Sequence, residues 1–177
     1  QGESNTNRKL IGLIEKNPAL FKHERLRGRI IKALGIASVF ECAEIMEFIE
    51  ANIAAFERQL KKCLRALLAS GKLGQHNTFE AQGAHCILRI LIRSALTHPE
   101  RASETLKYVY EVILLAQGAP EYLVYTALDG LKRLNKYNLG ESMRDRLIVS
   151  LQHFTHSAYP WIRSMASEII TSECLYY

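Results

Sequence analysis

Two stretches decide the fold of this chain: LKYVYEVILLAQGAPEYLVYTALDGLKRL, residues 106–134, and RLIVSLQHFTHSAYPWIRSMASEIITS, residues 146–172. In each, an amphipathic helical pattern is followed by a short break and then by a proline, Pro120 or Pro160. Proline suits the first turn of a helix because its missing N–H would have no intrahelical partner there. The stretches therefore predict two helix pairs, with second helices that start at the prolines and tolerate alanine there.

The rest of the chain also has a helical pattern, because Val, Ile and Leu recur mostly at spacings of three and four residues. Asn17 and Pro18 predict a helix start, and Ser38 with Glu41 has the form of a capping box. We expect an all-α protein of about nine helices, over residues 7–16, 18–34, 38–51, 53–70, 78–97, 100–117, 120–137, 141–156 and 160 to near the end.

Three of these helices have a clear apolar face. The helix over 53–70 is expected to bury Phe56, Leu60, Cys63, Leu64 and Leu67. The helix over 100–117 is expected to bury Leu106, Val109, Tyr110 and Ile113. The helix over 141–156 repeats that pattern 41 residues later with Leu147, Leu151 and Phe154.

A helix pair that repeats at about forty residues is typical of HEAT and armadillo solenoids. WIRSMASEII, residues 161–170, resembles the second helix of a HEAT repeat, and ILRILIRS, 87–94, aligns with LDGLKRL, 128–134. The chain thus resembles the HEAT/armadillo-like family over roughly residues 100–177. The resemblance implies a HEAT-like right-handed α-α superhelix.

The N-terminal part, residues 1–77, departs from this repeat pattern. It carries 13 Lys and Arg against 8 Asp and Glu, whereas residues 78–177 carry 10 of each. Residues 27–73 also resemble a winged-helix domain, which would place Arg58, Lys61, Lys62 and Arg65 on a recognition helix. We expect one continuous domain, with residues 1–77 as divergent repeats or a cap and 78–177 as HEAT-like repeats.

Composition restricts the class of protein. A hydrophobic content of 48% is enough for a packed core, and no apolar run is long enough to span a membrane. None of the four cysteines forms a CxxC pair, which favours a reducing compartment. The chain begins without Met, so we expect a piece of a longer intracellular protein of the cytoplasm or nucleus.

The proposed site is a groove for a partner protein. In HEAT-like proteins second helices usually line the concave face, so the resemblance implies a groove along residues 78–97, 120–137 and 160 onward. We expect a non-enzymatic protein–protein interaction scaffold that binds an acidic or peptide-like segment. The candidate partner-binding residues are Arg89, Arg93, Tyr125, Lys132, Arg133 and Arg163.

Two basic stripes give an alternative. Lys22, Arg25, Arg29 and Lys32 recur on one predicted helix, and Arg58, Lys61, Lys62 and Arg65 on another. These charges could be solvated or paired with the glutamates of residues 41–50, or could bind an acidic protein or nucleic acid. The candidate nucleic-acid-binding residues are Lys22, Arg25, Arg29, Arg58, Lys61, Lys62 and Arg65.

The chain lacks a phosphate-binding glycine loop, GxSxG and HExxH, so no catalytic site is predicted. Asp129, Trp161 and Arg163 match the residue types with which one HEAT-like class repairs alkylated DNA bases, but they occupy ordinary repeat positions. His153 and His156 lack the further ligands that a zinc site needs. We predict no cofactor and no metal.

Overall fold

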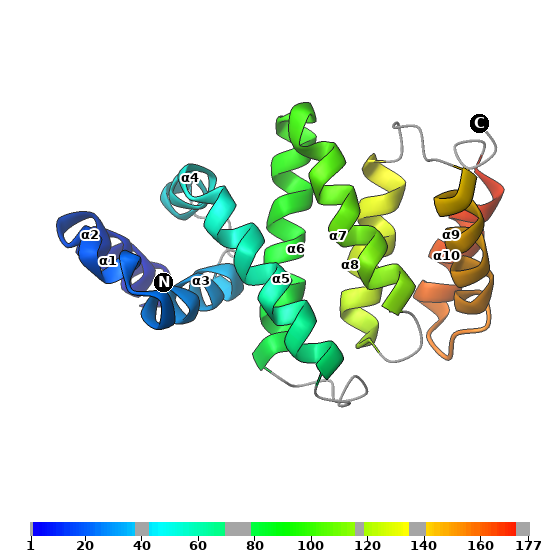
Figure 1. The fold of residues 1–177 in the computed structure, drawn as a ribbon, viewed down its shortest axis with the longest axis horizontal. Helices are drawn as coiled ribbons and strands as arrows, with labels where there is room; N and C mark the ends of the chain where they lie inside the picture. The colour runs from blue at the N-terminus through cyan, green and yellow to red at the C-terminus, as the bar shows by residue number, and fades with distance from the viewer. Residues whose placement is uncertain (1, 38–42, 70–78, 116–118, 135–140, 173–177) are drawn as a thin grey trace.

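The computed structural model describes residues 2–37, 43–69, 79–115, 119–134 and 141–172. These residues form helices and short connections, with no strand among them, so the predicted all-α class is confirmed (Figure 1). The α-helices are α1 (Gly2–Lys16), α2 (Pro18–Lys22), α3 (Glu24–Ala37), α4 (Ala43–Ala51), α5 (Ile53–Ala69), α6 (Phe79–Thr97), α7 (Ala102–Leu115), α8 (Glu121–Leu134), α9 (Glu141–Phe154) and α10 (Pro160–Thr171). A 3-10 turn, η2 (Pro99–Arg101), precedes α7.

The helices from α5 onward are arranged as neighbouring pairs. α5 packs on α6, α7 on α8, and α9 on α10, while α6 contacts α8 and α8 contacts α10. Figure 1 shows α5, α7 and α9 nearer the viewer and α6, α8 and α10 behind them. α3 packs against both α5 and α6, and α1, α2 and α4 lie at the N-terminal end. The described part of the chain therefore forms an elongated stack with two layers of helices from α5 onward.

The single helix predicted over residues 18–34 is wrong, because the structure has α2 and α3 in its place. His23 has an extended backbone with φ −71° and ψ 113°, which ends α2. The carbonyl of His23 then accepts the first hydrogen bond of α3 from the Arg27 N–H at 2.8 Å. Phe21 on α2 packs edge-on against Phe48 of α4, with ring centroids 5.6 Å apart. The described residues thus contain ten α-helices, not about nine.

The prediction that a proline is the first residue of a helix is confirmed for Pro160 and wrong for Pro120. Pro160 is the first residue of α10, and the Tyr159 carbonyl accepts the first hydrogen bonds of that helix. Pro120 instead precedes α8, and its own carbonyl accepts from the N–H groups of Leu123 and Val124 at 3.0 and 3.1 Å. Its ring is buried, whereas Pro160 is exposed. Pro120 therefore caps α8 and does not open it.

Some of the other predicted helix starts and ends lie within the described residues, and others do not. Asn17 precedes α2, but its side chain makes no capping hydrogen bond. α3 continues through Gly35 to Ala37, so the predicted end at Gly35 is wrong. The predicted caps at Ser38 with Glu41 and at Thr78 lie outside the described residues.

A continuous apolar core runs through the stack from Ile11 to Ile169. The predicted faces are confirmed, since the structure buries Phe56, Leu60, Cys63, Leu64, Leu67, Leu106, Val109, Tyr110, Ile113, Leu147, Leu151 and Phe154. α6 and α8 approach closely at Gly130, where an added Cβ would lie 2.5 Å from Ile92 Cδ1. Among the described helices, none has both the length and the apolar character to cross a membrane.

Candidate functional site

A groove lies between α6 and α8, and we call it the α6–α8 groove. Its volume is about 580 Å³. The lining residues are His85, Arg89, Ile92, Arg93, Tyr125, Thr126, Asp129 and Arg133. Four of the six residues predicted to bind a partner therefore line one groove, namely Arg89, Arg93, Tyr125 and Arg133.

Helical spacing explains why these side chains converge. On α6 the lining positions are separated by three, four or one residues, so they share one face. The opposite face of α6 holds the fully buried Ile87 and Leu91, which fixes the helix against the core. On α8, Leu128 and Leu131 do the same while Tyr125 and Arg133 reach the groove. The core residues thus determine which polar residues face each other.

The groove has an excess of positive charge. Among the described lining residues, three guanidinium groups, from Arg89, Arg93 and Arg133, stand against one carboxylate, that of Asp129. Asp129 pairs with Arg133 on the next turn of α8, with Oδ2 3.1 Å from Nε. Tyr125 adds an aromatic side chain that is 37% exposed. The groove therefore offers charge for an anion and apolar surface beside it.

His85 and Thr126 connect the two helices within the groove. His85 Nδ1 lies 2.9 Å from Thr126 Oγ1, and the imidazole packs edge-on against Tyr122 with ring centroids 5.2 Å apart. Burial lowers the pKa of His85 below its ordinary value, and the nearby charge of Arg89 lowers it further. The hydrogen bond that the imidazole donates to the backbone of Tyr122 raises the pKa, but this effect is the smallest of the three. These effects favour a neutral imidazole.

Sequence reasoning did not select His85 and Thr126 as a pair. The two residues are 41 positions apart, which is also the spacing between the buried patterns that start at Leu106 and Leu147. Neighbouring second helices in a stack bring together residues that differ by one repeat. A search for polar pairs at that spacing could have found this contact.

Two predicted partner-binding residues lie outside the α6–α8 groove. Lys132 points to α10, where its Nζ lies 2.7 Å from Glu168 Oε1. Arg163 on α10 donates from Nη1 to the Ser157 carbonyl at 2.8 Å. Both side chains are exposed, and their hydrogen bonds connect parts of the C-terminal half of the chain.

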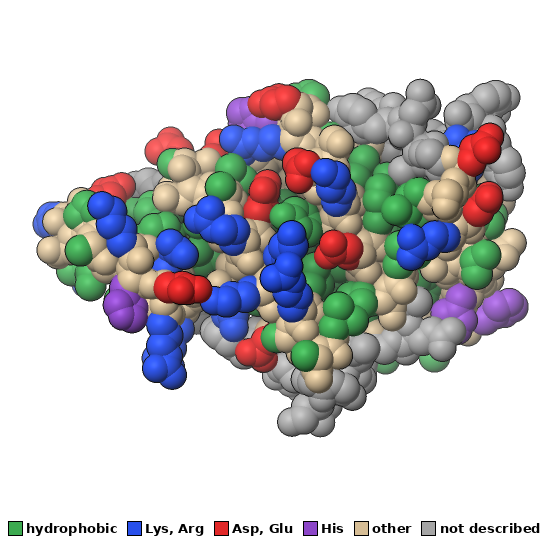
Figure 2. Space-filling model, viewed as in Figure 1, with side chains coloured by type: hydrophobic (Ala, Val, Ile, Leu, Met, Phe, Trp, Pro, Cys, Tyr) green, Lys and Arg blue, Asp and Glu red, His purple; other side chains and the backbone are tan. Residues whose placement is uncertain are grey.

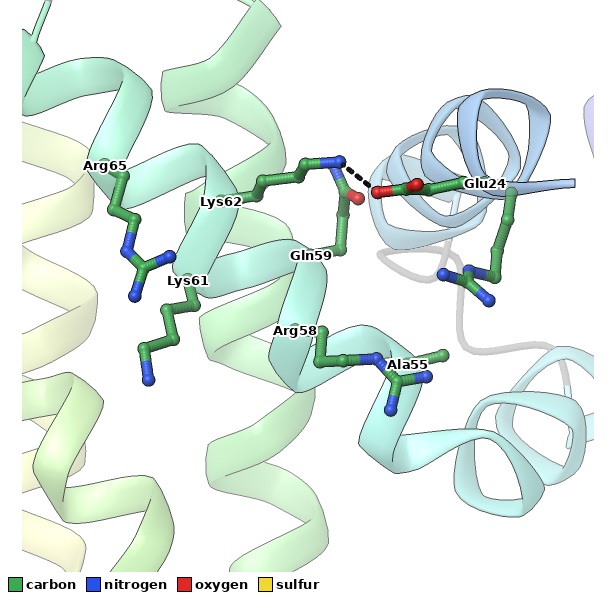
Figure 3. A pocket seen from close by; sticks show the side chains of 8 residues that line it. Glu24, Ala55, Arg58, Gln59, Lys61, Lys62 and Arg65 are labelled. Atoms are coloured by element: carbon green, nitrogen blue, oxygen red, sulfur yellow. Dashed lines mark hydrogen bonds and ion pairs between the residues drawn. The ribbon is translucent and has the colours of Figure 1, made fainter.

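A second groove, which we call the α3–α5 groove, lies between those helices (Figure 3). Its volume is about 310 Å³. The lining residues are Glu24, Arg27, Ala55, Arg58, Gln59, Lys61, Lys62 and Arg65. The structure thus brings together the second predicted basic stripe and adds Arg27 and Glu24, which the prediction did not include.

Lys62 behaves differently from the other cations of α5 in this groove. Figure 3 shows Lys61 and Arg65 projecting from one side of α5 and Arg58 extending toward Ala55, while Lys62 reaches across to Glu24. Lys62 Nζ lies 3.1 Å from Glu24 Oε1, and both side chains are well exposed. The hydrogen bond and charge of Lys62 hold the pKa of Glu24 below its ordinary value, and Arg27 lowers it slightly more. Five cationic side chains therefore face one carboxylate.

The first predicted basic stripe does not form one surface. Lys22 is on α2, before the break at His23, while Arg25 and Arg29 line a separate hollow of about 380 Å³ on α3. Lys32 turns toward α6, with its Nζ 3.5 Å from Glu80 Oε1. The stripe was derived from one continuous helix, so the break at His23 separates Lys22 from the three residues on α3.

The described residues do not bring together the side chains proposed for base repair or for a zinc site. Asp129 lines the α6–α8 groove, but Trp161 and Arg163 do not. His153 packs edge-on against Phe154 with ring centroids 5.8 Å apart. Within the described ranges, no group of three or more His, Cys, Asp and Glu side chains could hold a metal ion. For the winged-helix resemblance, the chain is already helical from Phe79, which leaves residues 70–78, outside the described part, for a wing.

Comparisons of the chain with protein-family models, with curated proteins and with solved structures gave no match.

Proposed function

We propose that this protein is a HEAT-like helical-repeat scaffold that binds an acidic segment of a partner protein in the α6–α8 groove. Function follows from a site and not from a fold alone, so the proposal depends on the groove. The observation that carries it is the convergence of Arg89, Arg93, Arg133 and Tyr125 on one groove of about 580 Å³.

The repeat part of the proposal is supported by the pattern of helix contacts. Each pair from α5 to α10 packs on its neighbour through alternate helices, as solenoid repeats do. Polar contacts between successive second helices span 41 residues for His85 with Thr126 and 36 for Lys132 with Glu168. Both spacings are close to the length of a HEAT or armadillo unit.

The choice of an acidic segment follows from the chemistry of the lining residues. Arginine binds carboxylates with two parallel hydrogen bonds, so it selects planar anions with defined geometry. Tyr125, which is exposed, offers apolar area next to these charges, and tyrosine commonly anchors protein interfaces. A peptide with carboxylates next to an apolar side chain would satisfy both features.

Binding of a defined peptide panel tests the proposal. Fluorescein-labelled peptides with alternating glutamate and leucine, and their lysine counterparts, would be titrated against the protein by anisotropy. The double variant Arg89→Glu with Arg93→Glu should weaken glutamate-peptide binding at least tenfold. Lys107→Glu with Lys132→Glu is the matched control, because it changes net charge equally at exposed cations outside the groove, and it should change affinity less than twofold. Unchanged binding in the Arg89→Glu with Arg93→Glu variant would refute the proposal.

A further inference from the structure

We propose that the α3–α5 groove is a second binding surface, for the phosphate backbone of double-stranded nucleic acid. This surface is on α3 and α5, whereas the partner-protein groove is on α6 and α8. The two proposals therefore rest on different residues and can fail independently.

The cations of α5 have a spacing that suits successive phosphates. Arg58 and Arg65 are seven residues apart, which corresponds to about 10 Å along a helix that rises about 1.5 Å per residue. One strand of a duplex presents a phosphate about every 3.4 Å along its axis, so about three phosphates fit within this length. Lys61 and Lys62 lie between the two arginines, and Arg27 supplies a cation from α3.

Charge on this surface is strongly unbalanced. Among the residues that the structure describes, Arg27, Arg58, Lys61, Lys62 and Arg65 line the groove with only the Glu24 carboxylate against them. Figure 2 shows Lys and Arg side chains gathered over α3 and α5 on this face. The Glu24–Lys62 ion pair is solvent-exposed, with 74% and 63% of the side chains accessible, so a phosphate can replace the carboxylate at Lys62 with little cost.

The uncharged lining residues favour a duplex over the other possible polyanions. Among the described residues that line the groove, these are Ala55 and Gln59. Neither can stack on an unpaired base, as single-strand binding requires. Neither offers the large apolar anchor that an acidic peptide would use, in contrast to the exposed Tyr125 in the α6–α8 groove. Contacts to phosphates alone are sufficient for sequence-independent binding to a duplex.

A salt titration with a labelled duplex tests this proposal. The probe is a fluorescein-labelled random-sequence DNA duplex of about 20 base pairs, followed by anisotropy at about 50 and about 200 mM KCl. We expect micromolar binding at the lower salt concentration. About four neutralised phosphates give a log–log slope of about −3.6, so fourfold more salt should weaken binding on the order of 100-fold.

Matched charge reversals decide whether the groove is responsible. The variant Arg58→Glu with Lys61→Glu and Arg65→Glu should lose at least 30-fold in affinity for the duplex at the lower salt concentration. The control Lys107→Glu with Lys132→Glu and Arg163→Glu changes net charge equally, at exposed positions that line neither groove, and should lose less than threefold. Circular dichroism and thermal melting would establish that both variants fold.

Several outcomes would overturn the proposal: no duplex binding at low salt, equal losses in the two triple variants, or tighter binding of single-stranded DNA or of the glutamate peptides at this groove. The Arg89→Glu with Arg93→Glu variant should keep its affinity for the duplex. Duplex binding and peptide binding are measured on the same variants, so the two proposals can be tested separately. Failure of duplex binding would leave the peptide result intact, and failure of peptide binding would leave the duplex result intact.

Discussion

His85 and Thr126 join α6 to α8 through a 2.9 Å contact between Nδ1 and Oγ1. The contact lies in the α6–α8 groove, next to the side chain of Arg89. Because the two residues belong to successive second helices, this polar contact helps to set the register between neighbouring pairs. Protonation of His85 would place a positive charge in a half-buried position beside a guanidinium group.

Stability should therefore decrease as the pH falls below about 6.5, the ordinary pKa of histidine. The folded-state pKa of His85 is lowered, so the unfolded chain binds a proton first as the pH falls, and each such proton favours unfolding. The loss should level off once the pH is below the folded-state pKa. Urea denaturation at pH 7.5 and 5.5 measures it.

His85→Gln is the variant that isolates this effect, because glutamine does not titrate and still offers hydrogen bonds to Thr126. The difference in free energy of unfolding between the two pH values should be smaller for His85→Gln than for the original chain. An equal pH dependence in both chains would show that other groups cause the acid sensitivity.

Gly130→Ala should destabilise the fold. The added Cβ would lie 2.5 Å from Ile92 Cδ1, 3.0 Å from Ile92 Cγ1 and 3.2 Å from Val109 Cγ2, all in buried side chains. Overpacking of this kind typically costs about 1–3 kcal/mol, which exceeds the gain of about 1 kcal/mol from replacing a helical glycine. The midpoint of urea denaturation measures the change.

Gly12→Ala is the matched control for Gly130→Ala. Gly12 is also helical, but an added Cβ there meets no atom of the described residues within 4 Å. The substitution should stabilise the chain by up to about 1 kcal/mol, since alanine has the higher helix propensity. If both variants changed stability in the same direction, the close approach at Gly130 would not be the cause.

Pro120→Ala and Pro160→Ala should differ, although the sequence predicted that both would be tolerated. Pro160→Ala affects an exposed first helical residue, so its cost should stay below about 1 kcal/mol, mainly from greater freedom of the unfolded chain. Pro120→Ala also removes a buried ring, which should add about 1 kcal/mol or more. Thermal melting of the two variants would compare them, and equal shifts would contradict the buried cap.

At alkaline pH, ionisation of the buried Tyr110 phenol should lower the stability of the fold. Burial raises its pKa from 10.0 to about 12, so the unfolded chain loses this proton first as the pH rises. Stability should therefore fall between about pH 10 and 12, and Tyr110→Phe should remove that part of the loss while changing little at pH 7. Ultraviolet titration of the phenolate, combined with melting curves, measures both. If Tyr110→Phe lost as much stability at high pH as the original chain, Tyr110 would be ruled out as the source.

The helical class and the buried faces could be predicted because they depend on local spacing. Phe56, Leu60 and Leu64 recur at helical intervals, and that pattern alone identifies the face that must be buried. The break at His23 could not be predicted in this way. Helical spacing continues through it, and the contact of Phe21 with Phe48 depends on how separate helices meet.

The difference between local spacing and packing of separate helices also explains which residues of the candidate sites were predicted. Arg89, Arg93 and Arg133 were selected because their positions on second helices are visible in the sequence. Arg27 was missed because it forms the opposite wall of a groove whose other wall is α5. Spacing within one helix does not report the approach of another. A prediction of grooves therefore needs the packing between helices, whereas a prediction of stripes does not.

The stacking of neighbouring pairs also bears on how the chain reaches this structure. Contacting helices are close in sequence, so closing the loops between them costs little entropy and favours rapid folding. α6 touches α3, α5, α7 and α8, more elements on both sides than a terminal helix can reach. We expect a folding nucleus around α6, from which the remaining helices are added outward toward both ends.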